Sequence, residues 1–150
     1  MNTPTVLITG ALTGIGRATA LAFAHEGAQF VVSGRHDDEG QKLADELRKL
    51  GTEADFLRTD VRHEEEVKNL VDKTIARFGR LDIAVNNGGT VGNPGSAADV
   101  TTENYQAIFD TNVLGVLLSM KYEIRALLRQ GKGSIVNISR LAISLIWPKA

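Results

Sequence analysis

The stretch Thr9–Gly16, which reads Thr-Gly-Ala-Leu-Thr-Gly-Ile-Gly, constrains the fold of this chain more than any other. It follows a short apolar run and leads into an Ala-rich segment that favours a helix. Three glycines in this stretch leave the backbone without Cβ atoms. Gly10 does so where the turn is tight, Gly14 where an anion must approach the backbone, and Gly16 where helix meets strand. Free N–H groups and the positive end of the helix dipole then face the anion. A strand, a glycine turn and a helix in this order predict a phosphate-binding site, although glycine spacing alone is also typical of simple chain reversals.

Strand-like and helix-like segments alternate along the rest of the chain. Apolar or β-branched runs predict strands at 5–9, 28–33, 54–58, 81–85 and 134–138, and helical spacing predicts helices at 14–26, 37–50, 64–78 and 102–128. Such alternation predicts βαβ units, and therefore an α/β fold with a doubly wound parallel sheet of the Rossmann type. We expect residues 1–150 to form one such domain, with the strands in the spatial order third, second, first, fourth, fifth and with the fold stopping after the fifth strand.

Composition excludes several classes of function. The net charge of −1 favours neither nucleic acid nor an anionic membrane as partner. The absence of cysteine excludes disulfides, thiolate chemistry and cysteine-ligated metals, and no metal site is predicted. No apolar run is long enough to span a bilayer, and the N-terminus does not have the pattern of a secretory signal. A cytoplasmic protein is the simplest expectation.

In a doubly wound sheet, ligands bind beyond the carboxyl ends of the strands, so the residues just past each strand are the candidate site. Arg35 follows the second strand at the position where an acidic side chain would bind a ribose 2′-hydroxyl. The planar guanidinium of an arginine binds phosphate well, so Arg35 favours NADP over NAD; the alternative is a solvated surface arginine. Asp60 follows the third strand and is suited either to accept a hydrogen bond from an adenine amino group or to act as a turn or cap residue.

Past the fourth strand, the run Asn86-Asn87-Gly88-Gly89 lets the backbone pass close to a flat ligand, although it also suits an ordinary turn.

Together these motifs resemble the short-chain dehydrogenase/reductase family. The resemblance covers about residues 4–139 and rests on Thr-Gly-x-x-x-Gly-Ile-Gly, Asp60-Val61, the Asn-Asn-Gly-Gly run, Asn112 and the run 133–139, Gly-Ser-Ile-Val-Asn-Ile-Ser. It implies binding of NAD(P)(H) and transfer of hydride between the nicotinamide and a small-molecule alcohol or carbonyl substrate. The cofactor-binding residues that it implies are Gly10, Thr13, Gly14, Ile15, Gly16, Arg35, Asp60, Val61, Asn87, Gly88 and Gly89. The family usually has alanine where Gly88 stands.

For catalysis, the resemblance implies a role for Asn112, which would support a proton-relay water through a local break in its helix, and for Ser139. The serine that polarises the carbonyl is the second of two in the family's Asn-x-Ser-Ser, and here the second position holds Arg140. The family's Tyr-x-x-x-Lys, which supplies the proton, does not occur in the 150 residues. We therefore expect hydride transfer by this chain to be impaired.

Two alternatives remain open at the level of sequence. The chain could be a non-catalytic NADP(H)-binding module, or a subunit that completes its sheet by pairing with a partner chain, including a second copy of itself. The mostly apolar segment 141–147 follows the last predicted strand, and we expect it either to fold over the edge of that strand or to drive self-association.

Overall fold

The computed structural model describes residues 3–139 and contains a five-stranded parallel sheet. The strands are β1 (Thr5–Thr9), β2 (Gln29–Gly34), β3 (Ala54–Arg58), β4 (Ile83–Asn86) and β5 (Ser134–Asn137). They are hydrogen-bonded in the order β3-β2-β1-β4-β5, and every pairing is parallel. The predicted α/β fold and strand order are confirmed. The order reverses direction between β1 and β4, which places a crevice beyond the carboxyl ends of these two strands.

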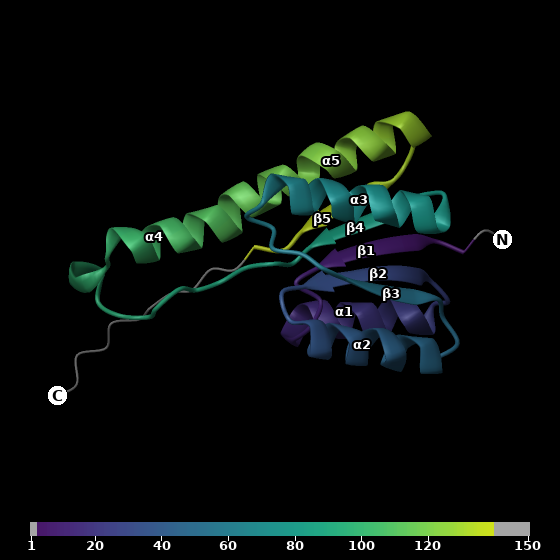
Figure 1. The fold of residues 1–150 in the computed structure, drawn as a ribbon, viewed down its shortest axis with the longest axis horizontal. Coiled ribbons are helices and arrows are strands. Elements are labelled where there is room, and N and C mark those ends of the chain that lie inside the picture. The colour runs from purple at the N-terminus through teal and green to yellow at the C-terminus, as the bar shows by residue number, and fades with distance from the viewer. Residues whose placement is uncertain (1–2, 140–150) are drawn as a thin grey trace.

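Helices cover both faces of the sheet. They are α1 (Gly14–His25), α2 (Asp37–Lys49), α3 (Glu64–Phe78) and α5 (Gly115–Gln130). Figure 1 shows α1 and α2 on one face, with α3 and α5 on the other. The sheet is thus the middle of three layers, as right-handed crossovers in both directions from β1 require.

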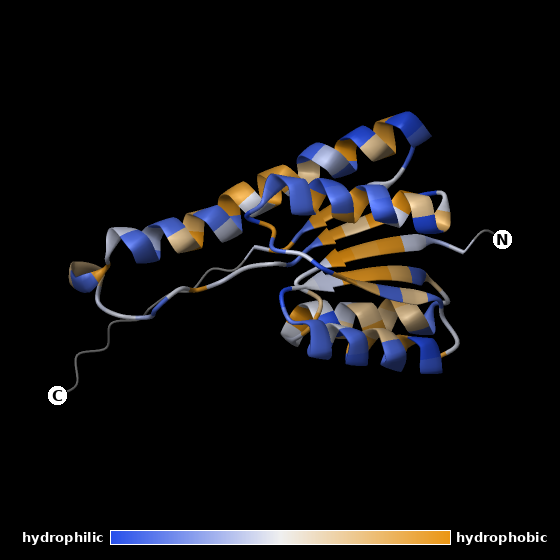
Figure 2. Cartoon of the chain, viewed as in Figure 1, coloured by the Kyte–Doolittle hydropathy of each residue, from blue (hydrophilic) through white to orange (hydrophobic). Residues whose placement is uncertain are grey.

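The alternation of side chains along β1 divides the apolar core into two parts. Val6 and Ile8 are fully buried on the face covered by α1 and α2, where Phe30 is also buried. Leu7 points to the other face and packs in a cluster with Leu70 of α3. The central residues of β1, β2 and β4 are accordingly apolar, while polar residues lie on the outer sides of the helices (Figure 2).

The sequence predicts one helix over 102–128, and the structure divides this segment into three parts. These are α4 (Thr102–Phe109), the π-helical segment η2 (Asp110–Leu114) and α5. A short 3₁₀ helix, η1 (Ala97–Asp99), lies in the loop before them. A single π-helical turn inside an α-helix marks a local break, which the family resemblance places at Asn112. Figure 1 shows α4 extending away from the sheet, beyond the carboxyl ends of the strands.

The predicted ends of the helices are close to the observed ones. Gly131 ends α5 with a φ of 83°, in the left-handed region that glycine adopts without a steric penalty. The predicted fold-over of segment 141–147, and the replacement of the family's second serine by Arg140, lie outside the described residues.

Candidate functional site

A cleft of about 400 Å³ lies at the carboxyl ends of β1, β2, β3 and β4. A second hollow of about 180 Å³ lies next to it, beside η2 and the end of β5, and three residues line both hollows. Of the residues predicted from sequence, the cleft is lined by Gly10, Thr13, Arg35, Asp60, Val61, Asn87, Gly88 and Gly89, and the second hollow by Asn87, Gly88, Gly89, Asn112 and Ser139. Gly14, Ile15 and Gly16 line neither hollow; they form the first turn of α1 beside the cleft.

The glycine turn after β1 packs directly against the run that follows β4. A Cβ on Gly10, whose φ is 62°, would lie 2.6 Å from the Cα of Gly88, and a Cβ on Gly16 would lie 2.3 Å from the carbonyl oxygen of Gly10. The Asn87 side chain donates to that same carbonyl oxygen at 2.7 Å, and the Gly88 N–H donates to the Thr9 hydroxyl at 3.3 Å. Two of the three glycines are therefore required by close contact between protein segments.

The N-terminus of α1 is open to an anion. Its first turn carries no acidic residue, and its N-cap residue Thr13 makes no capping hydrogen bond with its side chain. A Cβ on Gly14 would meet nothing within 4 Å, and Ile15 is half exposed. The first turns of α2 and α3 each carry three acidic residues, which already offset the dipole at those helix ends. The N-terminus of α1 thus fits a bound phosphate group. The negative charge of the phosphate would offset the dipole of α1, as the acidic residues do for α2 and α3.

At the end of β2, the cleft is bordered by the positive charge of Arg35 and by the carboxylate of Glu39. Arg35 is exposed and lines the cleft with His36, which lies 3.5 Å from the carboxylate of Glu39. None of the ion pairs within residues 3–139 involves Arg35. A Cβ on Gly34 would overlap the Leu12 side chain, at 2.6 Å, so the end of the strand carries no side chain of its own. Arg35 is therefore available to a ligand at this end of the cleft.

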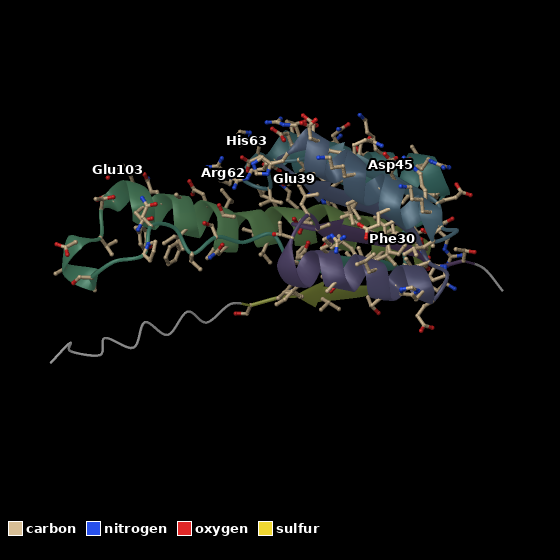
Figure 3. All side chains as sticks on the ribbon, turned by 90° about the horizontal axis from the view of Figure 1, so that it is seen from below. Phe30, Glu39, Asp45, Arg62, His63 and Glu103 are labelled. Carbon is tan, nitrogen blue, oxygen red and sulfur yellow. The ribbon has the colours of Figure 1, made fainter. Side chains whose placement is uncertain are left out.

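At the end of β3, Asp60 is 9% exposed and its carboxylate is held by Arg62. Hydrogen bonds from Arg62 lower the pKa of Asp60 to about 2, against the opposing effect of burial. The main-chain N–H of Arg62 also donates to Asp60 Oδ1 at 3.1 Å, so Asp60 acts as a turn residue, while His63 is the N-cap of α3. The predicted turn role is observed, and the carboxylate still borders the cleft. Figure 3 shows Arg62 and His63 toward the same end of the molecule as Glu39, with Asp45 toward the other end.

The second hollow brings the two predicted catalytic residues together. Asn112 lies in the middle of η2, and its amide is used twice by the loop after β4: Oδ1 accepts from the Thr90 N–H at 2.8 Å, and Nδ2 donates to the Thr90 carbonyl at 2.8 Å. Ser139 is exposed, just past the end of β5. The side chain of Asn112 therefore holds the loop after β4, whose residues Gly88 and Gly89 line both hollows.

One buried group near the site was missed by the sequence analysis. Glu123 of α5 is 1% exposed and accepts a hydrogen bond from the Asn86 amide at 2.9 Å; that amide also donates to Asn137 at 3.0 Å. Burial raises the pKa of Glu123 to about 7. Its position on the core-facing stripe of α5, between Ser119 and Ala126, is the signal that could have identified it.

Within residues 3–139, no group of three or more histidine or acidic side chains is arranged to hold a metal ion. Over the same residues, the helices are too short or too polar to cross a bilayer.

A doubly wound parallel sheet, with a glycine turn after its first strand and a cleft at the switch in strand order, is the architecture of the dinucleotide-binding α/β proteins. The sequence model of the family described as short chain dehydrogenase matches residues 4–148. This chain belongs to that family.

Individual relatives agree with the family match. Cyclohexanol dehydrogenase from Acinetobacter sp. (strain SE19) is 37% identical over 141 residues, which are 94% of this chain and 56% of the relative. Among solved structures, actinorhodin polyketide ketoreductase with NADPH has a TM-score of 0.87 and 35% identity, over 91% of this chain and 53% of that one. NAD⁺-bound xylitol dehydrogenase has a TM-score of 0.88 and 32% identity, over 91% and 52%. This chain spans about half the length of the relatives that it matches.

Proposed function

We propose that this chain is the nucleotide-binding half of a reductase or dehydrogenase that uses NADP(H) and acts on an alcohol or carbonyl compound. The observation that carries the proposal is that the two hollows are neighbours, with Asn87, Gly88 and Gly89 lining both. The cleft presents Thr13, the N-cap of α1, together with Arg35 and Asp60 to a dinucleotide. The adjoining hollow presents Asn112 and Ser139 to a substrate. The relatives include a ketoreductase solved with NADPH and a cyclohexanol dehydrogenase, which supports both parts of the proposal.

Within the cleft, each part of a dinucleotide has a proposed partner. The main-chain N–H groups of Gly14, Ile15 and Gly16 hold the pyrophosphate, aided by the dipole of α1. Asp60 and Val61 hold the adenine, and the run after β4 holds the ribose next to the nicotinamide. Gly10 and Thr13 shape the turn that supports the pyrophosphate.

Arg35 is proposed to select NADP(H) by binding the 2′-phosphate. The Arg35→Asp variant should reverse the preference, because it places a carboxylate beside the phosphate; losing a charge-assisted hydrogen bond alone corresponds to roughly tenfold to a hundredfold in affinity. Fluorescence titration of wild type and variant with NADPH and NADH tests this. Equal affinities in the wild type, or tighter binding of NADH, would contradict the NADP assignment while leaving dinucleotide binding intact.

For the reaction, a bound nicotinamide supplies or accepts the hydride. Ser139 and the main-chain groups of η2 border the space for the substrate, and a water held at η2 would carry the proton. Because Asn112 uses its amide to hold Thr90, its part in the relay rests on the break in the helix rather than on the side chain.

We further propose that the 150-residue chain by itself binds the cofactor but turns over slowly. It contains no Tyr-x-x-x-Lys, and general acid catalysis typically contributes ~10²–10⁴-fold. The test is NADPH oxidation by the purified chain with a panel of small ketones. Turnover at ordinary enzyme rates, on the order of 1–10³ s⁻¹, would refute this part of the proposal.

A further inference from the structure

A series of hydrogen bonds leads from the buried carboxyl group of Glu123 to the wall of the second hollow. Asn86, at the end of β4, is also buried, and its Nδ2 donates both to Glu123 Oε2 at 2.9 Å and to Asn137 Oδ1 at 3.0 Å. Asn137 ends β5, is exposed and lines the second hollow. Its own Nδ2 donates to the sulfur of Met120 at 3.2 Å. The series therefore joins a carboxyl group in the interior to a side chain of the hollow.

The direction of these bonds matches an ionised Glu123. An amide group donates from its nitrogen and accepts at its oxygen, whereas an ionised carboxylate only accepts. Asn86 turns its nitrogen toward the carboxylate, and the two hydrogens of that nitrogen serve Glu123 and Asn137. Asn86 Oδ1 is buried and has no hydrogen-bond partner among the residues that the structure describes. The arrangement thus leaves one buried acceptor unused.

Protonation of Glu123 weakens the bond that sets this orientation. A hydrogen bond to an ionised group is roughly twice as strong as one between neutral groups, so the bond from Asn86 becomes weaker when the charge is lost. The protonated carboxyl also gains an O–H, for which the unused oxygen of Asn86 is a better partner than the nitrogen. The Asn86 amide is then free to turn, and Asn137 loses the donor that holds its oxygen.

Burial and the bond from Asn86 are the effects that act on the Glu123 carboxyl. Burial raises its pKa to about 7, against the opposing effect of the bond, and no charged group of a neighbouring element shifts it. The strands β4 and β5 contain no titratable residue. Asp110 of η2 acts on Arg62. The other titratable side chains of α5 and α3 near it contact one another: Lys121 and Tyr122 with Glu64, Arg125 with Tyr122, and Lys68 with Asp72.

We propose that Glu123 is a positioning residue of the second hollow: its ionised carboxylate holds the amides of Asn86 and Asn137 in one orientation, and its protonated form releases them. The hollow therefore has a fixed amide in its wall above the titration of Glu123 and a mobile one below it. The proposal deepens the proposed function and rests on it only for the assignment of this hollow to the substrate.

The experiment follows these side chains by NMR in the full chain, without ligand, from about pH 5.5 to about pH 8.5, on either side of the expected midpoint. Labels are ¹⁵N in asparagine, ¹³C in the glutamate carboxyl and ¹³C in the methionine methyl. The Glu123 carboxyl carbon should titrate with a midpoint of about 7. The side-chain N–H signals of Asn86 and Asn137 should shift with the same midpoint. The nuclear Overhauser effect between the Asn137 amide and the Met120 methyl should be present at the upper pH and lost at the lower.

Two variants and one reference signal separate Glu123 from other titrating groups. Glu123→Gln cannot ionise, so it should remove the pH dependence of both asparagine signals. Glu103→Gln removes an exposed carboxylate and should leave that dependence unchanged. The amide of Asn112 also lines the second hollow but is held at both ends by Thr90, so its signal should stay constant in all three proteins.

The possible outcomes separate this proposal from the proposed function. A Glu123 carboxyl that does not titrate in this range, or one that titrates while Asn137 stays unchanged, overturns the role of Glu123. An Asn137 signal that still titrates in Glu123→Gln does the same, and if that variant does not fold, the comparison of midpoints in the wild type decides. Titration of the same sample with NADPH tests the proposed function separately: a chain that shows the shared midpoint but binds no NADPH overturns the cofactor proposal and leaves the role of Glu123 standing.

Discussion

Glu123 shows how a single residue can make the stability of this protein depend on pH. The carboxyl group is buried in α5, and the partner that it contacts, the Asn86 amide, is neutral. An ionised carboxylate without a cationic partner is costly to bury, and this is why the pKa of Glu123 rises from 4.5 to about 7. The folded state therefore binds the proton of Glu123 more tightly than the unfolded state does.

The sign of the resulting pH dependence follows from linkage. The stabilising effect of the protonated carboxyl is complete below pH 4.5 and is lost as the pH rises to about 7. Glu123→Gln cannot ionise, so its stability relative to wild type should increase by about 3 kcal/mol between pH 4.5 and pH 7.5. Urea unfolding of both proteins across this range measures the difference.

Exposed Glu103 provides the control for that measurement, because Glu103→Gln removes the same charge from a solvated position. Because Glu103 lies in the first turn of α4, where its charge offsets the helix dipole, the stability of Glu103→Gln relative to wild type should change by no more than about 1 kcal/mol over the same pH range. A change as small as this for Glu123→Gln would show that the buried carboxyl does not hold its proton.

Among the elements, the glycine turn has the least room for change. A Cβ on Gly16 would meet main-chain oxygen on one side and the Asn87 amide, at 2.5 Å, on the other. Gly16→Ala should lower the free energy of unfolding by about 1–3 kcal/mol or more, as overpacking does. Gly95→Ala, at a position where a Cβ meets nothing within 4 Å, should change it by no more than about 0.5 kcal/mol. Equal urea midpoints for the two variants would mean that the turn is looser than these distances indicate.

At the scale of the elements, the sequence predicts most of the helices and strands. Each predicted strand is present to within about two residues, because apolar runs between helical segments leave few alternatives. The division of the last long helix was expected at Asn112 only from the family resemblance. Helical spacing cannot reveal a π turn, since one inserted residue changes the hydrogen bonding while the surrounding pattern stays helical.

The candidate site was predicted less completely than the fold. Residues that follow strands, such as Arg35 and Asp60, are found from position alone, because all carboxyl ends of a parallel sheet lie at one edge. Arg62 was missed because its importance depends on the direction of its side chain. Glu123 was missed because a charged residue in a helix is ordinarily assigned to the solvent side.

On the scale of the whole molecule, β5 is an edge strand of the sheet that residues 3–139 form. β5 is the last strand in the order, and beside it α5 exposes Leu117, Ile124 and Leu128, whose exposed fractions are 59%, 40% and 75%. An open edge beside an apolar helix face favours association.

We therefore expect the 150-residue chain to self-associate, with Leu128→Lys weakening the association, because a fully buried leucine contributes about 1.5–3 kcal/mol. Sedimentation velocity at several concentrations measures this. Leu50→Lys is the control, since Leu50 is also exposed, at 43%, but lies at the end of α2. A monomeric wild type, or equal effects of the two substitutions, would argue against association through this side.

The central place of β1 in the sheet has a consequence for synthesis on the ribosome. Thr5 bonds to Gln29 across 24 residues on one side of the strand, but to Asp82 across 77 residues on the other. At translation rates of about 5–20 residues per second, Asp82 is made roughly 4–15 s after Thr5. The edge of β1 that pairs with β4 stays unpaired for that time. Once β2 has been made, the nascent chain still carries an apolar strand with one unpaired edge until β4 follows. Molecular chaperones bind such segments, so the most buried strand of the finished protein is also the one that most needs protection while the chain is being made.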